Sequence, residues 1–168
     1  DWLTGMRGGE SALEHILTLV PEAQLFTLMH TPGSVSAQIE SHRPRHTFVQ
    51  HLPFSRTRYR NYLPIFPAAI EHLDLDDYDI VISTSHCAAK AAIPPGKARH
   101  LCYCFTPMRY AWDQFDAYFG VKQVGRWQSR FYRIAMDRLA SWDMTTADRV
   151  DRYVAISQYV ASRIDRYY

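Results

Sequence analysis

The sequence predicts an α/β fold: a Rossmann-like, mostly parallel sheet with helices on both faces. Short apolar segments that suit strands alternate with longer segments whose apolar residues recur at helical spacing. One such strand, residues 101–105 (LCYCF), carries no charged side chain, as expected for a strand buried on both faces of a parallel sheet. Glycine, histidine or charged residues follow the expected strand ends, where ligands bind in open α/β sheets.

The composition is that of one globular domain. Of the 168 residues, 47% are hydrophobic and 21% are charged, and the net charge of +2 does not favour a nucleic-acid-binding protein. The three cysteines lack paired C-x-x-C spacing, so we expect neither a metal site nor a disulfide framework. The lack of a disulfide framework favours a reducing compartment, so the expected location is cytoplasmic. No apolar stretch approaches the length that spans a bilayer, and no signal peptide is recognised.

The first ten residues suit a strand end followed by a phosphate-binding loop. The chain starts without methionine, as DWL, and Gly8 and Gly9 then open a helix that Pro21 stops. Free amide hydrogens at the positive end of a helix dipole suit a phosphate. The alternative is a tight turn, which a Gly-Gly pair before a helix more often forms.

Two further strands are predicted at residues 24–28 (QLFTL) and 47–49 (TFV). Between them, the sequence predicts a loop that begins at His30 and a short helix that Ser34 or Ser36 caps. Residues 56–73 predict two helical pieces with a bend, because two prolines interrupt the helical spacing. Basic and aromatic residues begin this segment: Arg56, Arg58, Tyr59 and Arg60. They form either a solvated helix entrance or a patch for anionic lipid headgroups or a pyrophosphate.

Residues 78–83 (YDIVIS) predict the clearest strand, followed by His86 and a helix through Ala91. The strand 101–105 ends at Pro107, because proline has no amide hydrogen for the ladder. Charged and large aromatic residues follow it directly: Met108, Arg109, Tyr110, Trp112 and Asp113. This stretch is either a binding loop or an ordinary aromatic-rich connection.

The remaining residues predict a long amphipathic helix, a strand at 152–156 and a last helix that Ser157 caps, with Val160 and Ile164 facing inward. The apolar residues that mark the long helix are Trp127, Phe131, Ile134, Ala135, Leu139 and Trp142. In a single parallel sheet all carboxyl ends lie at one edge. The residues expected around one crevice are therefore 7–10, His30, His86, 109–113 and Ser157.

Four segments together resemble the amino-terminal half of a retaining glycosyltransferase of family 4, an enzyme of the two-domain GT-B fold. DWLTGMRGGE looks like the family's first-strand end and glycine loop. DLDDYDIVISTSHCAAKAAIPP and CYCFTPMRYAWDQF are similar to a bacterial subgroup of mannosyltransferases in surface-polysaccharide assembly. RVDRYVAISQYVASRI resembles the segment that leads toward the family's second domain.

The resemblance implies that the chain is a fragment. The first strand would begin before Asp1, and a carboxyl-terminal domain would carry most of the sugar-nucleotide site, including an E-x7-E-type motif. The implied reaction transfers a sugar, with mannose as a candidate, from a nucleotide-sugar donor to a glycan or lipid-linked acceptor with retention and without a cofactor or metal. A lipid-linked acceptor would place the enzyme on the inner face of the plasma membrane, with Arg56, Arg58, Tyr59 and Arg60 at that surface.

The same resemblance assigns site residues. Gly8 and Gly9 would approach the donor phosphates, and His86 would be the candidate catalytic imidazole, because Phe105 stands where family members often have histidine. A helix-capping or core histidine is the alternative for His86. The expected acceptor-side residues are Arg7, Glu10, Arg109, Tyr110, Trp112 and Asp113, of which Arg7 and Arg109 would bind acceptor or phosphate oxygens.

Two other classes of function remain open on the sequence. One is a non-catalytic nucleotide- or sugar-binding Rossmann-like module, and the other is an interaction domain with a vestigial crevice. Fold alone does not separate them from an enzyme. A downstream second Rossmann-like domain with paired glutamates would favour the transferase.

Overall fold

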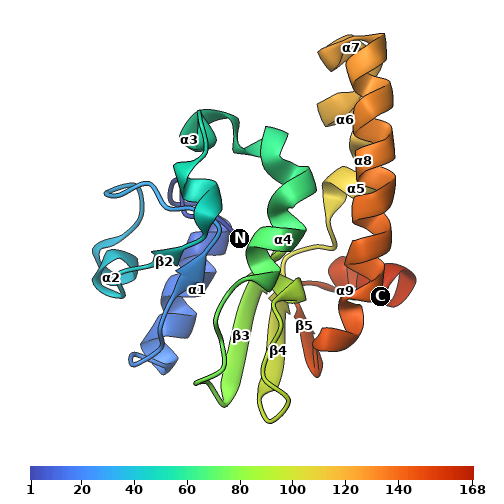
Figure 1. Ribbon diagram of the computed structural model, residues 1–168. Coiled ribbons are helices and arrows are strands. Elements are labelled where there is room, and N and C mark those ends of the chain that lie inside the picture. Colours follow the sequence, from blue (N-terminus) through green and yellow to red (C-terminus); the bar gives the residue numbers. More distant parts are fainter. The chain divides into compact units, whose positions relative to one another are not determined.

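The computed structural model describes residues 1–168, which form two compact units, Asp1–Asp74 (the first unit) and Leu75–Tyr168 (the second unit). Both units combine helices with parallel strands, so the predicted α/β class is confirmed (Figure 1). The strands form a two-stranded sheet, β1-β2, and a three-stranded sheet, β3-β4-β5. The expectation of one continuous sheet was therefore wrong. No helix of the chain combines the length and apolarity needed to cross a membrane.

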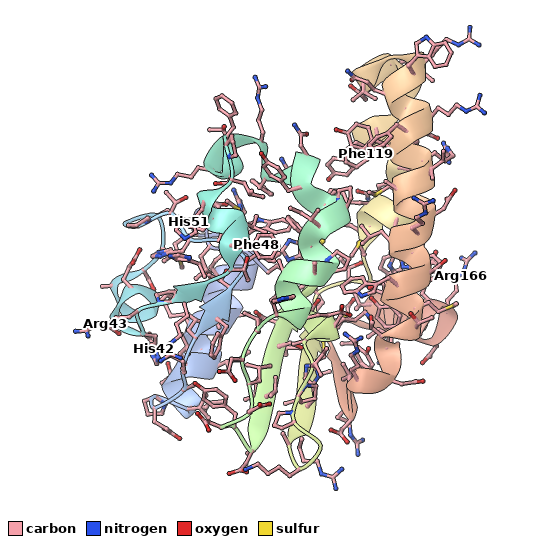
Figure 2. The ribbon with its side chains drawn as sticks, viewed as in Figure 1. His42, Arg43, Phe48, His51, Phe119 and Arg166 are labelled. Atoms are coloured by element: carbon pink, nitrogen blue, oxygen red, sulfur yellow. The ribbon has the colours of Figure 1, made fainter.

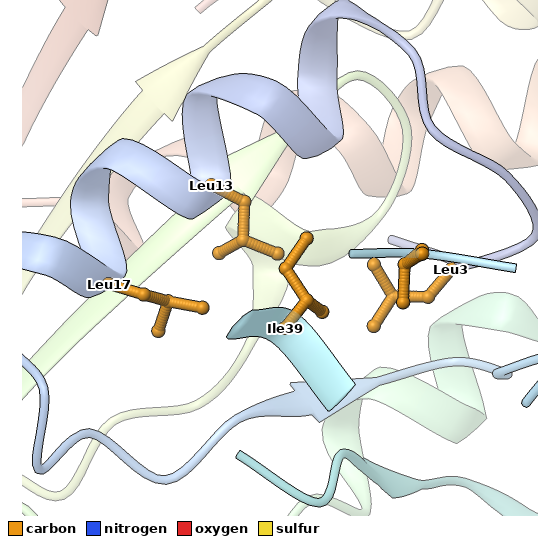
Figure 3. Close-up of a cluster of buried hydrophobic side chains, with 5 residues drawn as sticks. Leu3, Leu13, Leu17 and Ile39 are labelled. Atoms are coloured by element: carbon orange, nitrogen blue, oxygen red, sulfur yellow. The ribbon is translucent and has the colours of Figure 1, made fainter. Parts of the chain in front are cut away.

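The first unit is built around helix α1 (Gly8–Leu19), which confirms the predicted helix before Pro21. Strand β1 (Phe26–Thr27) pairs in parallel with β2 (Arg45–His46), and α2 (Ala37–Ser41) lies between them in the chain. Ser36 caps α2 by accepting a hydrogen bond from the amide of Ile39 at 3.4 Å. Five side chains form the local core shown in Figure 3: Leu3, Leu13, Leu17, Val35 and Ile39.

The rest of the first unit is a series of short helices: η1 (Phe48–His51), α3 (Ser55–Arg58), η2 (Tyr59–Ile65) and α4 (Phe66–Glu71). The predicted bend is present, because Pro64 lies in a 3₁₀ segment and Pro67 in the first turn of α4. The predicted strand at 47–49 was wrong. Thr47 instead caps η1, accepting a hydrogen bond from the amide of Val49.

The sheet of the second unit contains β3 (Ile80–Ser85), β4 (Arg99–Cys104) and β5 (Arg152–Ala155), all parallel. Ser85 pairs with Cys104, and Cys104 pairs with Ala155, so the three strands end at the same edge. The helix expected after His86 is only a short 3₁₀ turn, η3 (Ala89–Ala91).

Five helices complete the second unit: α5 (Arg109–Trp112), α6 (Phe115–Phe119), α7 (Val121–Val124), α8 (Arg126–Thr145) and α9 (Gln158–Tyr167). A 3₁₀ turn, η4 (Ala147–Arg149), precedes β5. Phe119 of α6 lies beside α8, with its ring stacked on Tyr132 at 4.5 Å between centroids (Figure 2). Ser157 caps α9 through the amide of Val160, as predicted.

The predicted apolar face of the long helix was partly wrong. Leu139 is buried as expected, but Trp127, Phe131 and Ile134 are exposed. The side chains that α8 buries are Ser129, Met136, Leu139 and Asp143. Because a serine and an aspartate are among them, the packing of α8 depends on polar partners as well as on hydrophobic side chains.

Candidate functional site

The glycine loop follows the first parallel contact of the first unit. Leu3 forms an isolated parallel bridge with His30, and α1 begins five residues later at Gly8. The backbone amide of Arg7 donates a hydrogen bond to Glu10 Oε2 at 3.0 Å. Glu10 is buried, so this carboxylate acts as a cap that fixes the start of α1 and places negative charge at the positive end of its dipole.

Gly8 leaves open space at the helix start. A methyl group built there would meet no atom within 4 Å, so packing inside the chain does not require glycine at this position. A ligand phosphate that approaches the backbone closely would require it, because any side chain holds a ligand away. The open space would admit a ligand, but it does not by itself select a phosphate over a turn, and the Glu10 carboxylate already caps this helix start.

His30 is held on several sides within the first unit. Its Nε2 lies 3.1 Å from Glu40 Oε1, and the same oxygen accepts the amide of Gly33 at 2.7 Å. The side chain of Gln50 forms two hydrogen bonds with the His30 backbone. Its Oε1 accepts from the His30 amide at 2.8 Å, and its Nε2 donates to the His30 carbonyl at 3.0 Å. His30 is therefore a fixed side chain at the isolated bridge with Leu3, three residues after β1.

The second unit brings His86 and Phe105 to the same sheet edge. Ser85 and Cys104 are paired neighbours, so the residues that directly follow them leave adjacent strands together. His86 is half-buried at this edge, and Arg109, at the start of α5, is also half-buried. The prediction that these two segments leave neighbouring strands at one sheet edge is confirmed, and the crevice expected around them stays a prediction.

The aromatic residues of this loop belong largely to the interior. Tyr110 is 3% exposed, and its ring meets Tyr118 edge-on at 4.7 Å between centroids. Trp112 stacks on Tyr167 at 4.6 Å and donates from Nε1 to Asp143 Oδ2 at 2.7 Å. A sugar ring could stack on Tyr110 only if that side chain left its buried position.

Asp113 connects the same loop to α9. Its carboxylate forms an ion pair with Arg163 and accepts a hydrogen bond from the Tyr167 hydroxyl at 2.6 Å. This hydrogen bond raises the pKa of Tyr167, because the nearby carboxylate disfavours the phenolate. Trp112 and Asp113 therefore position the loop, and the polar group of each is already engaged inside the unit.

A buried ion pair that the sequence analysis did not identify anchors this arrangement. Lys90 Nζ lies 3.2 Å from Asp143 Oδ1 and donates to the Asp143 carbonyl at 2.6 Å and to Thr146 Oγ1 at 3.1 Å. The Tyr168 hydroxyl also donates to Asp143, and its ring lies 4.4 Å from the ammonium nitrogen. Burial lowers the pKa of Lys90, an effect that the Asp143 charge opposes.

A serine–histidine contact in the second unit is structural. Ser83 Oγ lies 2.9 Å from His100 Nε2, which is typical of a nucleophile and its base. His100 Nδ1, however, contacts the Arg149 carbonyl at 2.9 Å, and both side chains are buried in the sheet. Because a carbonyl only accepts, Nδ1 carries the proton and Nε2 accepts from the serine hydroxyl.

In the expected membrane patch the arginines lie on the surface, but the tyrosine is buried. Arg56, Arg58 and Arg60 are exposed, whereas Tyr59 is 7% exposed and packs on Trp2 at 4.8 Å between ring centroids. Phe54, which the sequence analysis did not select, is exposed and adopts a left-handed backbone with φ of 56°. A membrane contact at this segment would therefore use the arginines together with Phe54.

Comparisons with protein families, curated proteins and solved structures give no match. The structure contains no cluster of three or more histidine, cysteine, aspartate or glutamate side chains arranged to hold a metal ion. The candidate residues of each unit follow its parallel strands: the Gly8 loop in the first unit, and His86 and Arg109 in the second.

Proposed function

We propose that the chain forms the amino-terminal, acceptor-side half of a retaining glycosyltransferase with a Rossmann-like fold, acting in surface-polysaccharide synthesis. The observation that carries the proposal is the position of the candidate residues relative to the strands. The glycine loop follows the parallel bridge at Leu3, and His86 and the 105–113 segment follow the paired ends of β3 and β4. Carboxyl ends of parallel strands are where open α/β folds bind ligands.

In the proposed reaction the bond between the anomeric carbon and the donor's pyrophosphate oxygen breaks. A bond to the acceptor hydroxyl oxygen forms on the same face of the sugar, and the hydroxyl proton passes to the departing pyrophosphate oxygen. Negative charge builds on the departing pyrophosphate. Amide hydrogens at Gly8 and Gly9 and the guanidinium of Arg7 are suited to stabilise that charge.

On the acceptor side, Arg109 is suited to bind an acceptor oxygen, and His86 to orient a sugar hydroxyl or the leaving phosphate. Trp112 and Asp113 would act indirectly, because their contacts with Asp143 and Arg163 fix the loop that carries Arg109. The donor sugar proposed is mannose, with a glycan or lipid-linked acceptor.

The experiment that tests this function uses the product of the whole gene and a panel of sugar nucleotides, with release of nucleoside diphosphate as the readout. Acceptor-dependent release is expected with one donor class, and Arg109→Ala should lower kcat/KM roughly 100-fold, equivalent to about 2.7 kcal/mol of transition-state stabilisation. Arg152→Ala is the matched control, because Arg152 is an exposed arginine at the opposite end of its strand. Donor binding without turnover would favour the non-catalytic module instead.

A further inference from the structure

Helix α8 carries apolar side chains on two opposite faces. One face is buried and includes Met136 and Leu139. The other consists of Trp127, Phe131 and Ile134, which are 86%, 66% and 49% exposed and which we call the outer stripe. At 3.6 residues per turn, positions four and seven residues apart share a face, so these three side chains form one line along the helix.

The surroundings of the outer stripe are basic. Between Asp116 and Asp137 the chain contains four basic residues, Lys122, Arg126, Arg130 and Arg133, and no acidic one. Arg133 is engaged, since its guanidinium pairs with Asp116 at 3.3 Å and covers the Phe115 ring. The other three side chains are exposed, and no ion pair is formed by any of them.

The outer stripe occupies the end of the second unit that lies far from its sheet. Figure 1 shows α7 and the first turns of α8 at the opposite end of this unit from the tips of β3 and β4. Gly125, with φ of 84°, makes the turn that joins α7 to α8. Val121 of α7 is 56% exposed, so this short helix also presents an apolar side chain on the surface.

We propose that the outer stripe, with Lys122, Arg126 and Arg130, is a contact surface for an anionic lipid membrane. A narrow apolar line bordered by cations is the pattern of a helix that lies in the interface, with its apolar side chains among the acyl chains and its basic groups at the headgroups. Tryptophan favours this region because its ring is apolar and its N–H is polar. The unbalanced positive charge selects an anionic surface over a neutral one.

This surface is made of other residues than the 56–60 segment and does not depend on the proposed enzymatic function. A second protein is the competing occupant, since tryptophan and arginine are also enriched at protein interfaces. The absence of any carboxylate across this stretch favours a lipid surface of one sign, because protein interfaces usually pair charges of both signs.

The test is binding of the 168-residue chain to vesicles of phosphatidylglycerol and phosphatidylcholine, compared with phosphatidylcholine alone. The expected result is co-sedimentation with the anionic vesicles and a blue shift of Trp127 emission that Trp127→Phe removes. Arg126→Gln with Arg130→Gln should weaken binding roughly 30-fold, because each basic residue at an anionic surface contributes about fivefold. Trp127→Ser with Phe131→Ser should weaken it roughly 100-fold.

The matched control is Leu19→Ser with Ile80→Ser, which removes two exposed apolar side chains elsewhere, 81% and 67% exposed, and should leave binding unchanged. All the substituted positions are on the surface, so circular dichroism should show the same fold for every variant. Equal binding to neutral and anionic vesicles, or equal losses in the control and in Trp127→Ser with Phe131→Ser, would overturn the proposal. The proposal would also be overturned if the chain bound no vesicles and instead associated with itself in a concentration-dependent way that Trp127→Ser abolishes.

Discussion

Lys90 Nζ lies 3.2 Å from Asp143 Oδ1, and the two side chains are 1% and 0% exposed. The pair connects η3, beside the end of β3, to the last turns of α8. Trp112 and Tyr168 donate further hydrogen bonds to the same carboxylate, so one buried charge organises four segments of the second unit. The loop that carries Arg109 is positioned through this carboxylate.

Removing one partner of this pair should destabilise the chain strongly. Asp143→Ala leaves a buried ammonium without its counter-charge, and we expect a loss of about 3–5 kcal/mol in the free energy of unfolding. Urea unfolding measures it. Asp79→Asn is the control, because the Lys97–Asp79 pair is exposed and should contribute no more than about 1 kcal/mol. Equal losses in the two variants would show that the buried pair has no special role.

The buried imidazole of His100 should make stability depend on pH. Burial lowers the pKa of His100 from its usual value near 6.5, so just below pH 6.5 the unfolded chain binds a proton that the folded chain does not. Stability should therefore fall as the pH decreases from about 6.5, by up to about 1.4 kcal/mol per pH unit, and be retained above it.

Replacing His100 tests this directly. In His100→Gln the slope of stability between pH 6.5 and 5 should be smaller than in the parent chain. Asp151 does not contribute in this window, because the His100 amide and Arg99 hold its pKa below the usual aspartate value. Identical slopes in the two proteins would mean that the buried imidazole is not the titrating group.

The three arginines of the 56–60 segment should give salt-sensitive attraction to anionic vesicles. Changing Arg56, Arg58 and Arg60 to glutamine should weaken binding at low ionic strength and matter less as salt is added. The emission shift of Trp127 should persist in this variant, because that residue reports on α8. An unchanged affinity would reduce the segment to a solvated helix entrance.

The 168-residue chain alone should bind sugar nucleotides weakly. The resemblance assigns most donor contacts to a second domain, and each tenfold loss of affinity corresponds to about 1.4 kcal/mol. Isothermal titration calorimetry with a panel of donors should detect no micromolar complex. A micromolar dissociation constant for any donor would indicate that the Gly8 loop and its unit form a complete site.

Local signals in the sequence predicted the elements that depend on neighbouring residues. The helix before Pro21 and the Ser36 and Ser157 caps depend on neighbouring residues, and all are present. The division into two sheets was not predictable in this way, because β1 and β2 are only two residues long and apolar spacing does not specify which strands pair.

The contacts that organise the second unit required the fold. Lys90 and Asp143 are 53 residues apart, and neither has a local pattern that marks a buried charge. The face of α8 was assigned incorrectly for a related reason. Trp127 and Phe131 have side chains as hydrophobic as those of a core, yet both are exposed. Helical periodicity alone does not distinguish a face that packs inside the unit from one that is exposed to solvent.

The measurement that tests the proposed function most directly is the anomeric configuration of the product. The product of the whole gene would be incubated with the donor that supports turnover and with an acceptor, and the new linkage would be followed by NMR from the first minutes. Retention of the donor's anomeric configuration, lost together with nucleotide release in Arg109→Ala, is the predicted result. Inversion, or no sugar transfer with any donor, would contradict it.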